Sequence, residues 1–116
     1  INYIKGIGSG NALVPESEGS SILTNTKITL NHYLDIIILN GNYSLMLESG
    51  FVSNLPATGK HVVFCNASTE TKIITLPNNA AIKSDKETLT VTAKGYAEID
   101  LIKGSTDTIL IKSSVL

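Results

Sequence analysis

Residues of the kind that carry out metal or thiol chemistry are few in this 116-residue chain. It holds two histidines, His32 and His61, and one cysteine, Cys65. A transition-metal site takes about four nitrogen, sulfur or oxygen ligands, so these residues would need help from Asp35 or from a second chain. His32 on a three-fold axis between copies is one arrangement that would supply it. We predict that no metal is bound, and a lone cysteine excludes an internal disulfide.

One pair of carboxylates has a spacing that could serve catalysis. Glu98 and Asp100 stand two residues apart, which places both side chains on the same face of a strand. Glycoside hydrolysis uses two carboxylates that flank the scissile bond, often from different strands across a groove. A solvated strand face explains the same spacing, and we interpret the pair in that way. The chain is therefore predicted to have no catalytic residue.

Two glycine-containing segments partly resemble phosphate-binding loops. Segment 6–10 (GIGSG) lacks the third glycine of a dinucleotide-binding turn, because Asn11 stands there, and no helix pattern follows it. Residues 59–60 end like a phosphate loop, but His61 follows where that loop has Ser or Thr. Ser9 also lacks the strand-to-helix setting of an esterase nucleophile. We predict that the protein binds no cofactor and is not an enzyme.

Composition points away from nucleic acid and from membranes. The nine basic residues are all lysines, and the formal net charge is -1. Reading of phosphates and bases in nucleic acid relies heavily on Arg and on a basic face. The longest uninterrupted aliphatic run spans four residues, Ile36–Leu39, whereas a helix that crosses a bilayer needs about 20. Neither a nucleic-acid partner nor a membrane partner is expected.

The elements that hold these residues are expected to be strands. The chain has 15 Ile, 6 Val and 12 Thr, and β-branched side chains favour pleated strands. From Ile22 onward apolar and polar residues alternate at period two, with turn residues about every 8 to 12 positions. This pattern predicts an all-β fold, a compact antiparallel β-sandwich, jelly-roll-like, of about eight strands, and no helix. Residues 22–116 would form this domain.

The alternation also predicts which side chains face the core. The strand from Tyr33 to Leu39 is apolar enough to be buried on both faces, and Cys65 is expected to be a buried thiol. Asn40-Gly41 is a hairpin signal, with Gly41 at positive φ. Phe51 and Leu55 would anchor a long loop to the core. The inward-facing residues of the other strands are expected to be Ile28, Leu30, Tyr43, Leu45, Leu47, Leu89, Val91, Ala93, Ala97, Ile99 and Leu101.

The first 21 residues are interpreted as an extended N-terminal arm or linker. Four glycines and Pro15 lie in this segment, and such residues punctuate regular structure. An apolar tip with flexible glycines behind it suits docking on another chain. The predicted partner-contact residues of the arm are Ile1, Tyr3, Ile4 and Ile7.

A series of segments in fixed order goes beyond generic alternation. Tyr33 to Leu45 (YLDIIILNGNYSL) precedes the turn at 54–60 (NLPATGK) and the strand at 62–66 (VVFCN). The strand patterns IITL and LTV and the closing segment at 95–102 (GYAEIDLI) follow. This order resembles the small β domains of bacteriophage virion fibres and appendages, such as head fibres, tail fibres and decoration proteins. Many such domains end with a Gly-x-x-Trp step, whereas this chain has no Trp, which leaves the subfamily open.

The resemblance implies a function in the particle and carries over no active-site residue. It implies a non-enzymatic structural protein at the virion surface that acts in assembly and display. Its partners would be copies of itself in a homotrimer and other virion proteins. The alternative is a receptor- or glycan-binding module of an adhesin or fibre tip, whose partner would be a glycan of the host surface.

Overall fold

The computed structural model of the chain describes residues 4–7, 12–15, 26–31, 35–105 and 107–116. Nearly all regular structure in these residues is β, as the alternation predicts. The elements are β1 (Ile4–Ile7), β2 (Ala12–Pro15), β3 (Lys27–Leu30), β4 (Ile36–Leu39), β5 (Tyr43–Leu47), α1 (Phe51–Asn54), β6 (Lys60–Asn66), β7 (Lys72–Thr75), β8 (Ile82–Ser84), β9 (Thr88–Val91), β10 (Tyr96–Lys103) and β11 (Ile109–Val115).

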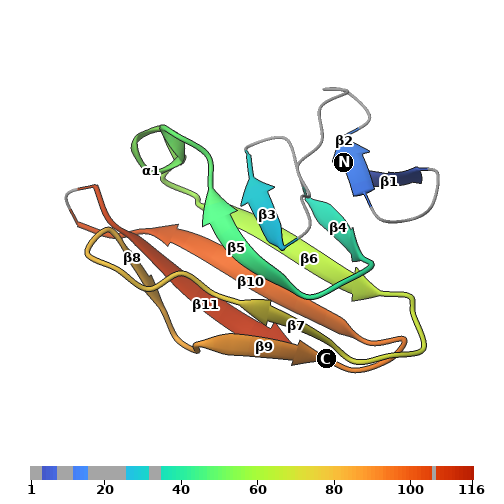
Figure 1. Cartoon of the computed structure of the whole chain (residues 1–116). Coiled ribbons are helices and arrows are strands. Elements are labelled where there is room, and N and C mark those ends of the chain that lie inside the picture. Colours follow the sequence, from blue (N-terminus) through green and yellow to red (C-terminus); the bar gives the residue numbers. More distant parts are fainter. Residues whose placement is uncertain (1–3, 8–11, 16–25, 32–34, 106) are drawn as a thin grey trace.

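Two sheets form the body of the molecule. The five-stranded sheet has the strand order β4-β6-β10-β11-β8, and the four-stranded sheet has the order β3-β5-β7-β9. The two sheets lie one over the other as layers (Figure 1). The predicted all-β sandwich is thus confirmed, with nine strands in its two layers.

The chain winds between the layers at almost every step. Consecutive strands from β3 to β10 alternate between the four-stranded and the five-stranded sheet, and only β10 and β11 are consecutive neighbours in one sheet. Strands two apart in sequence therefore often become neighbours. Among these pairs, β3–β5, β5–β7 and β4–β6 are parallel. The β8–β11 pair is parallel as well. The expectation of an antiparallel sandwich is correct only for three pairs of the two layers, β7–β9, β6–β10 and β10–β11.

The predicted hairpin at Asn40-Gly41 is wrong for the same reason. β4 pairs with β6 and β5 pairs with β3 and β7, so residues 40–42 form an arch that crosses from one sheet to the other. Positive φ among the described glycines occurs at Gly50 and Gly59, and Gly41 is outside that region. The Tyr43 hydroxyl donates to Asn40 Oδ1 and closes the arch.

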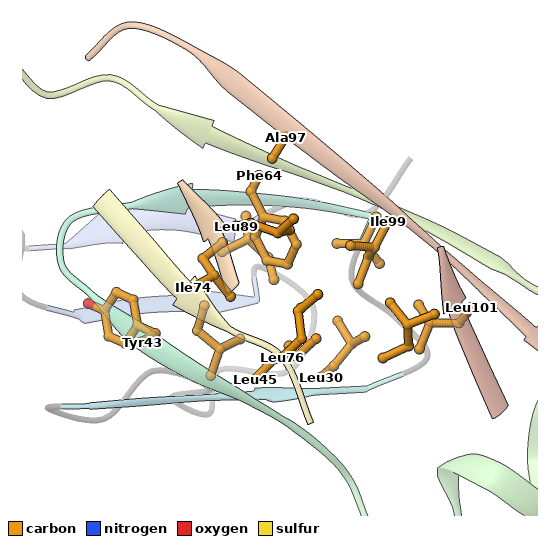
Figure 2. Packing of buried hydrophobic residues seen from close by; sticks show 14 of the residues in the cluster. Leu30, Tyr43, Leu45, Phe64, Ile74, Leu76, Leu89, Ala97, Ile99 and Leu101 are labelled. Carbon is orange, nitrogen blue, oxygen red and sulfur yellow. The ribbon is translucent and has the colours of Figure 1, made fainter. Parts of the chain in front are cut away.

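The core lies between the two layers. Figure 2 shows Phe64 and Ile99 of the five-stranded sheet together with Leu45 and Ile74 of the four-stranded sheet in this space. The predicted anchors Phe51 and Leu55 are buried, on and just after the four-residue helix α1, where no helix was expected. The inward faces of β3, β5, β9 and β10 agree with the sequence pattern, except that Ala93 lies exposed in the turn after β9.

One strand is less buried than expected. Tyr33–Leu39 was predicted to be covered on both faces, but its described strand, β4, buries only Ile37 and Leu39. Ile36 is half-buried and Ile38 is exposed. The reason is that the sandwich has only two layers, so one face of β4 meets the core and the other face points outward.

The N-terminal segment contains structure of its own. β1 and β2 pair with each other as an antiparallel two-stranded sheet, with Ile4 opposite Pro15 and Ile7 opposite Ala12. β1 lies close to β4. The predicted contact residues Ile4 and Ile7 thus stand at the two ends of β1, and Ile1 and Tyr3 lie outside the described residues. Docking of the arm on another chain stays a prediction.

Candidate functional site

A regular surface among the described residues is the outer face of the five-stranded sheet, the side that points away from the core. Strand register aligns its side chains in rows that run across the strands. We call this surface the outer face, and it consists of Ile36, Ile38, His61, Val63, Cys65, Lys83, Tyr96, Glu98, Asp100, Ile102, Leu110, Lys112 and Ser114.

The first row of the outer face is apolar. Ile38 lies opposite Cys65, and Cys65 lies opposite Tyr96. The Leu116 amide donates to the Tyr96 carbonyl oxygen and extends the row to the C-terminal residue. The exposed fractions are 37% for Ile38, 51% for Tyr96 and 70% for Leu116. Exposed apolar side chains in contact with one another mark interaction sites more often than scattered ones do.

The second row is mixed and consists of Ile36, Val63, Glu98 and Ser114. The third row is charged. His61 lies opposite Asp100, and Asp100 lies opposite Lys112. His61 Nδ1 is 2.7 Å from Asp100 Oδ1, and His61 Nε2 is 3.3 Å from Glu98 Oε2. A carboxylate only accepts, so the contact with Asp100 is a hydrogen bond when Nδ1 carries a proton. The contact with Glu98 is an ion pair only when the ring is charged. The imidazole then binds one carboxylate with each nitrogen.

This cluster brings together residues that the sequence analysis treated separately. Glu98 and Asp100 do lie on the solvated face of β10, as predicted, and His61 joins them from β6. The carboxylates contact different nitrogens of the ring, so the three groups do not converge on one point as metal ligands must. Within the described residues no three His, Cys, Asp or Glu side chains are placed to hold a metal ion.

The fourth row returns to apolar side chains. Ile102 lies opposite Leu110, and Leu110 lies opposite Lys83 of β8. Ile102 is 44% exposed and Leu110 is 46% exposed. A hollow of about 380 Å³ is open beside them. Further hollows, of about 300 and 390 Å³, lie beside Tyr96 and beside His61, so the outer face is uneven.

Cys65 belongs to the outer face, and its predicted burial is wrong. The thiol lies on β6 between Phe64 and Asn66, and its residue is only half-buried. The cause is register, since Val62 and Phe64 occupy the inward positions of β6 and leave Cys65 on the other side. The part of the thiol that is buried raises its pKa above the ordinary value.

A cavity of about 480 Å³ lies at the end of the sandwich where α1 faces the turn before β8. Its lining is largely apolar, and Met46, Phe51 and Val52 contribute to it. Glu48 and Asp107 supply acidic groups at the surface. The size lies in the range of small-molecule sites, of about 300 to 1,000 Å³, but such sites also gather several polar groups that orient a ligand.

Several residues that the sequence analysis singles out lie outside the described part of the chain. His32 and Ser9 lie outside the described residues, as do most of the residues of segment 6–10, and Gly6 is part of β1. Gly59 lies in the turn before β6, and Lys60 begins that strand, where its Nζ lies 3.0 Å from Asp35 Oδ1 in an ion pair. None of the helices in the described part of the chain has the length and apolarity that a membrane span requires.

Sequence reasoning missed the apolar rows of the outer face. The signal is present in the sequence, because Ile99, Leu101 and Ile102 break strict alternation and Leu110 stands where an outward polar residue is expected.

Comparisons with known proteins do not assign a function to the outer face. No family model, no curated protein and no solved structure matches the chain.

Proposed function

We propose that the chain is a non-enzymatic structural module of a bacteriophage appendage, located at the virion surface and acting in assembly and display. The observation that carries this proposal is the outer face, where large apolar side chains stand exposed in rows on a regular sheet. Such a face suits a protein that is covered by neighbours in an assembly. The order of segments that resembles phage fibre domains supplies the link to a virion.

The proposed partners are copies of the chain, as a homotrimer, and other virion proteins. Closed symmetric assembly is the common route by which small domains bury further apolar surface. A domain of about this size buries only about two thirds of the surface that its unfolded chain exposes, so contacts between subunits add substantially to its stability.

The test is to locate the chain in phage particles. Particles are purified from the strain that encodes the sequence, their proteins are identified by mass spectrometry, and antibodies against the domain are used for electron microscopy. The proposal predicts that the chain is in the particles and that the label lies on head or tail appendages. A chain found only in the bacterial cell fraction would overturn the virion assignment.

The alternative, a receptor- or glycan-binding module, has one supporting observation. Tyr96 exposes 51% of its surface beside a hollow of about 300 Å³ that Lys94 also lines. Sugar rings stack on exposed aromatic faces, and amino groups donate hydrogen bonds to their hydroxyls. Binding to a glycan array that is lost in Tyr96→Ala would favour this function, and a wild-type chain that binds no glycan would count against it.

A further inference from the structure

We propose that the outer face is the contact between copies of this chain, with β10 of one copy packed against β11 of the next. The sheets would pack face to face about a two-fold axis that runs parallel to the strands, so each contact joins two copies. This inference rests on the assembly role proposed above and names one surface that the role would use. A two-fold contact closes on two copies, so the three-fold contact of the proposed homotrimer would lie elsewhere on the chain.

The first argument is the order of the rows. An axis parallel to the strands keeps each row level with the same row of the neighbouring copy. The apolar row with Tyr96 then meets itself, as does the apolar row with Ile102 and Leu110. The charged row falls between them and also meets itself. An arrangement that shifted the rows would place Glu98 or Asp100 against apolar side chains, which costs desolvation energy.

The second argument is charge complementarity within the charged row. Asp100 on β10 and Lys112 on β11 are neighbours in register. When β10 of one copy faces β11 of the next, Asp100 of each copy meets Lys112 of the other. In the same arrangement Tyr96 meets the side chain of Leu116, and Ile102 meets Leu110. Tyr96, Asp100 and Ile102 of β10 thus each find a partner of suitable chemistry.

The third argument is size. When β10 faces β11, four strands of each face overlap, namely β6, β10, β11 and β8, and β6 and β11 are each seven residues long. Strand spacing of about 4.8 Å and a rise of about 3.3 Å per residue give a contact of at most about 440 Å² on each copy. The two copies together bury about 900 Å², which is the size of a weak interface whose occupancy depends on concentration. The hollows beside Tyr96, His61 and Ile102 allow side chains of the partner to interdigitate.

The experiment compares two isoleucines of equal exposure on opposite faces. Ile102 on the outer face is 44% exposed, and Ile73 on the four-stranded sheet is 42% exposed. The mass of the full chain is measured by sedimentation and light scattering over a range of concentrations. We expect association of the wild type, its loss in Ile102→Glu and its retention in Ile73→Glu. Thermal unfolding of both variants confirms that they fold.

The pairing of β10 with β11 is tested by charge reversal. Asp100→Lys places two lysines at the contact, and Lys112→Asp places two aspartates there, so each variant alone is expected to lose association. An equimolar mixture of the two variants restores opposite charges at every mixed contact. We expect the mixture to associate and neither variant to do so alone.

The outcomes separate this inference from the virion proposal. A wild-type chain that stays monomeric at all concentrations, or that dissociates equally in Ile73→Glu and Ile102→Glu, overturns the outer face as the contact. Failure of the charge-reversed mixture to associate overturns the β10–β11 pairing. Association in this manner by a chain that is absent from phage particles would sustain the interface and refute the virion function.

Discussion

At the residue scale, a few polar side chains fix the turns between the layers. Asn66 is 1% exposed, and its Nδ2 group donates to the carbonyl oxygens of Glu70, Val91 and Thr92 at 2.8, 2.9 and 3.1 Å. Its Oδ1 accepts hydrogen bonds from the amide and hydroxyl groups of Ser68. One amide therefore joins the turn after β6 to the end of β9, in the opposite sheet.

Asn66→Ala is expected to destabilise the fold. The substitution removes the hydrogen bond to the buried Val91 carbonyl, whereas the Thr92 and Glu70 carbonyls keep bonds from the Gly95 amide and the Ser68 hydroxyl. The expected cost is about 1 to 3 kcal/mol. The free energy of unfolding is measured by urea denaturation. Asn78→Ala, at an exposed asparagine in the loop after β7, is the matched control and should change the value by less than about 0.5 kcal/mol. Equal values for the two variants would refute the role given to Asn66.

A second residue-scale contact ties β8 to β11. Asp85 Oδ1 accepts from the Ser113 hydroxyl at 2.6 Å, and Oδ2 accepts from the Ser113 amide at 2.9 Å. Burial raises the pKa of Asp85, but the hydrogen bonds from Ser113 and the charge of Lys86 outweigh it, so the pKa lies below the ordinary 3.8. A carboxyl whose pKa is lower in the folded state stabilises the fold when it is ionised.

The lowered pKa of Asp85 predicts how the free energy of unfolding falls at acid pH. The contribution of Asp85 is present above pH 3.8, the ordinary pKa, and is lost as pH falls through the lower pKa of the folded state. Asp85→Asn should therefore lower the urea midpoint at pH 6 and narrow its difference from wild type toward pH 2. Glu87→Gln is the control on the same segment. A difference between Asp85→Asn and wild type that stays constant with pH would contradict the prediction.

At the element scale, arches and close approaches between strands decide the path of the chain. The arch at 40–42 is tied to the four-stranded sheet, because Asn42 Oδ1 accepts from the Ile73 amide at 2.8 Å. The turn at Gly59, which leads into β6, is held differently. Gly59 has φ 77°, and a Cβ there would lie 2.5 Å from the Leu101 carbonyl oxygen.

Gly59→Ala and Gly41→Ala should therefore differ. At Gly59 the new methyl group meets both unfavourable φ and a backbone atom, and we expect a loss of about 2 kcal/mol or more. At Gly41 it meets only the end of the Tyr43 side chain, 3.3 Å away at the hydroxyl, so the loss should stay below about 1 kcal/mol. Thermal unfolding followed by circular dichroism checks the order. An equal loss at both positions would contradict the arch geometry.

At the scale of the whole molecule, the core cluster of the described residues runs from Ile28 to Ile111 in the two layers. The arm contains a separate pair of strands, β1 and β2, and β1 lies near the edge strand β4. The role of the arm in assembly, by docking on another chain, stays a prediction.

Deletion of residues 1–10 tests the arm. If Ile1, Tyr3, Ile4 and Ile7 dock on a neighbouring copy, each buried side chain contributes about 1.5 to 3 kcal/mol before ordering costs. The deletion should then lower the mass seen by light scattering and leave the melting temperature of the domain nearly unchanged. Ile4→Ser/Ile7→Ser, at full chain length, is the companion variant. A mass unaffected by either change would refute the docking of the arm.

The sequence by itself determined the strands and most of their inward faces, because alternation is a local property with a period of two residues. It also placed Glu98 and Asp100 on a solvated face and Phe51 at the core. The tertiary structure decided which sheet each strand entered. Turn residues such as Asn40 and Gly41 reverse the chain in an arch as well as in a hairpin, and pairing with distant strands selects between them. The same long-range pairing brought His61 to Asp100 and left Cys65 on the outer face.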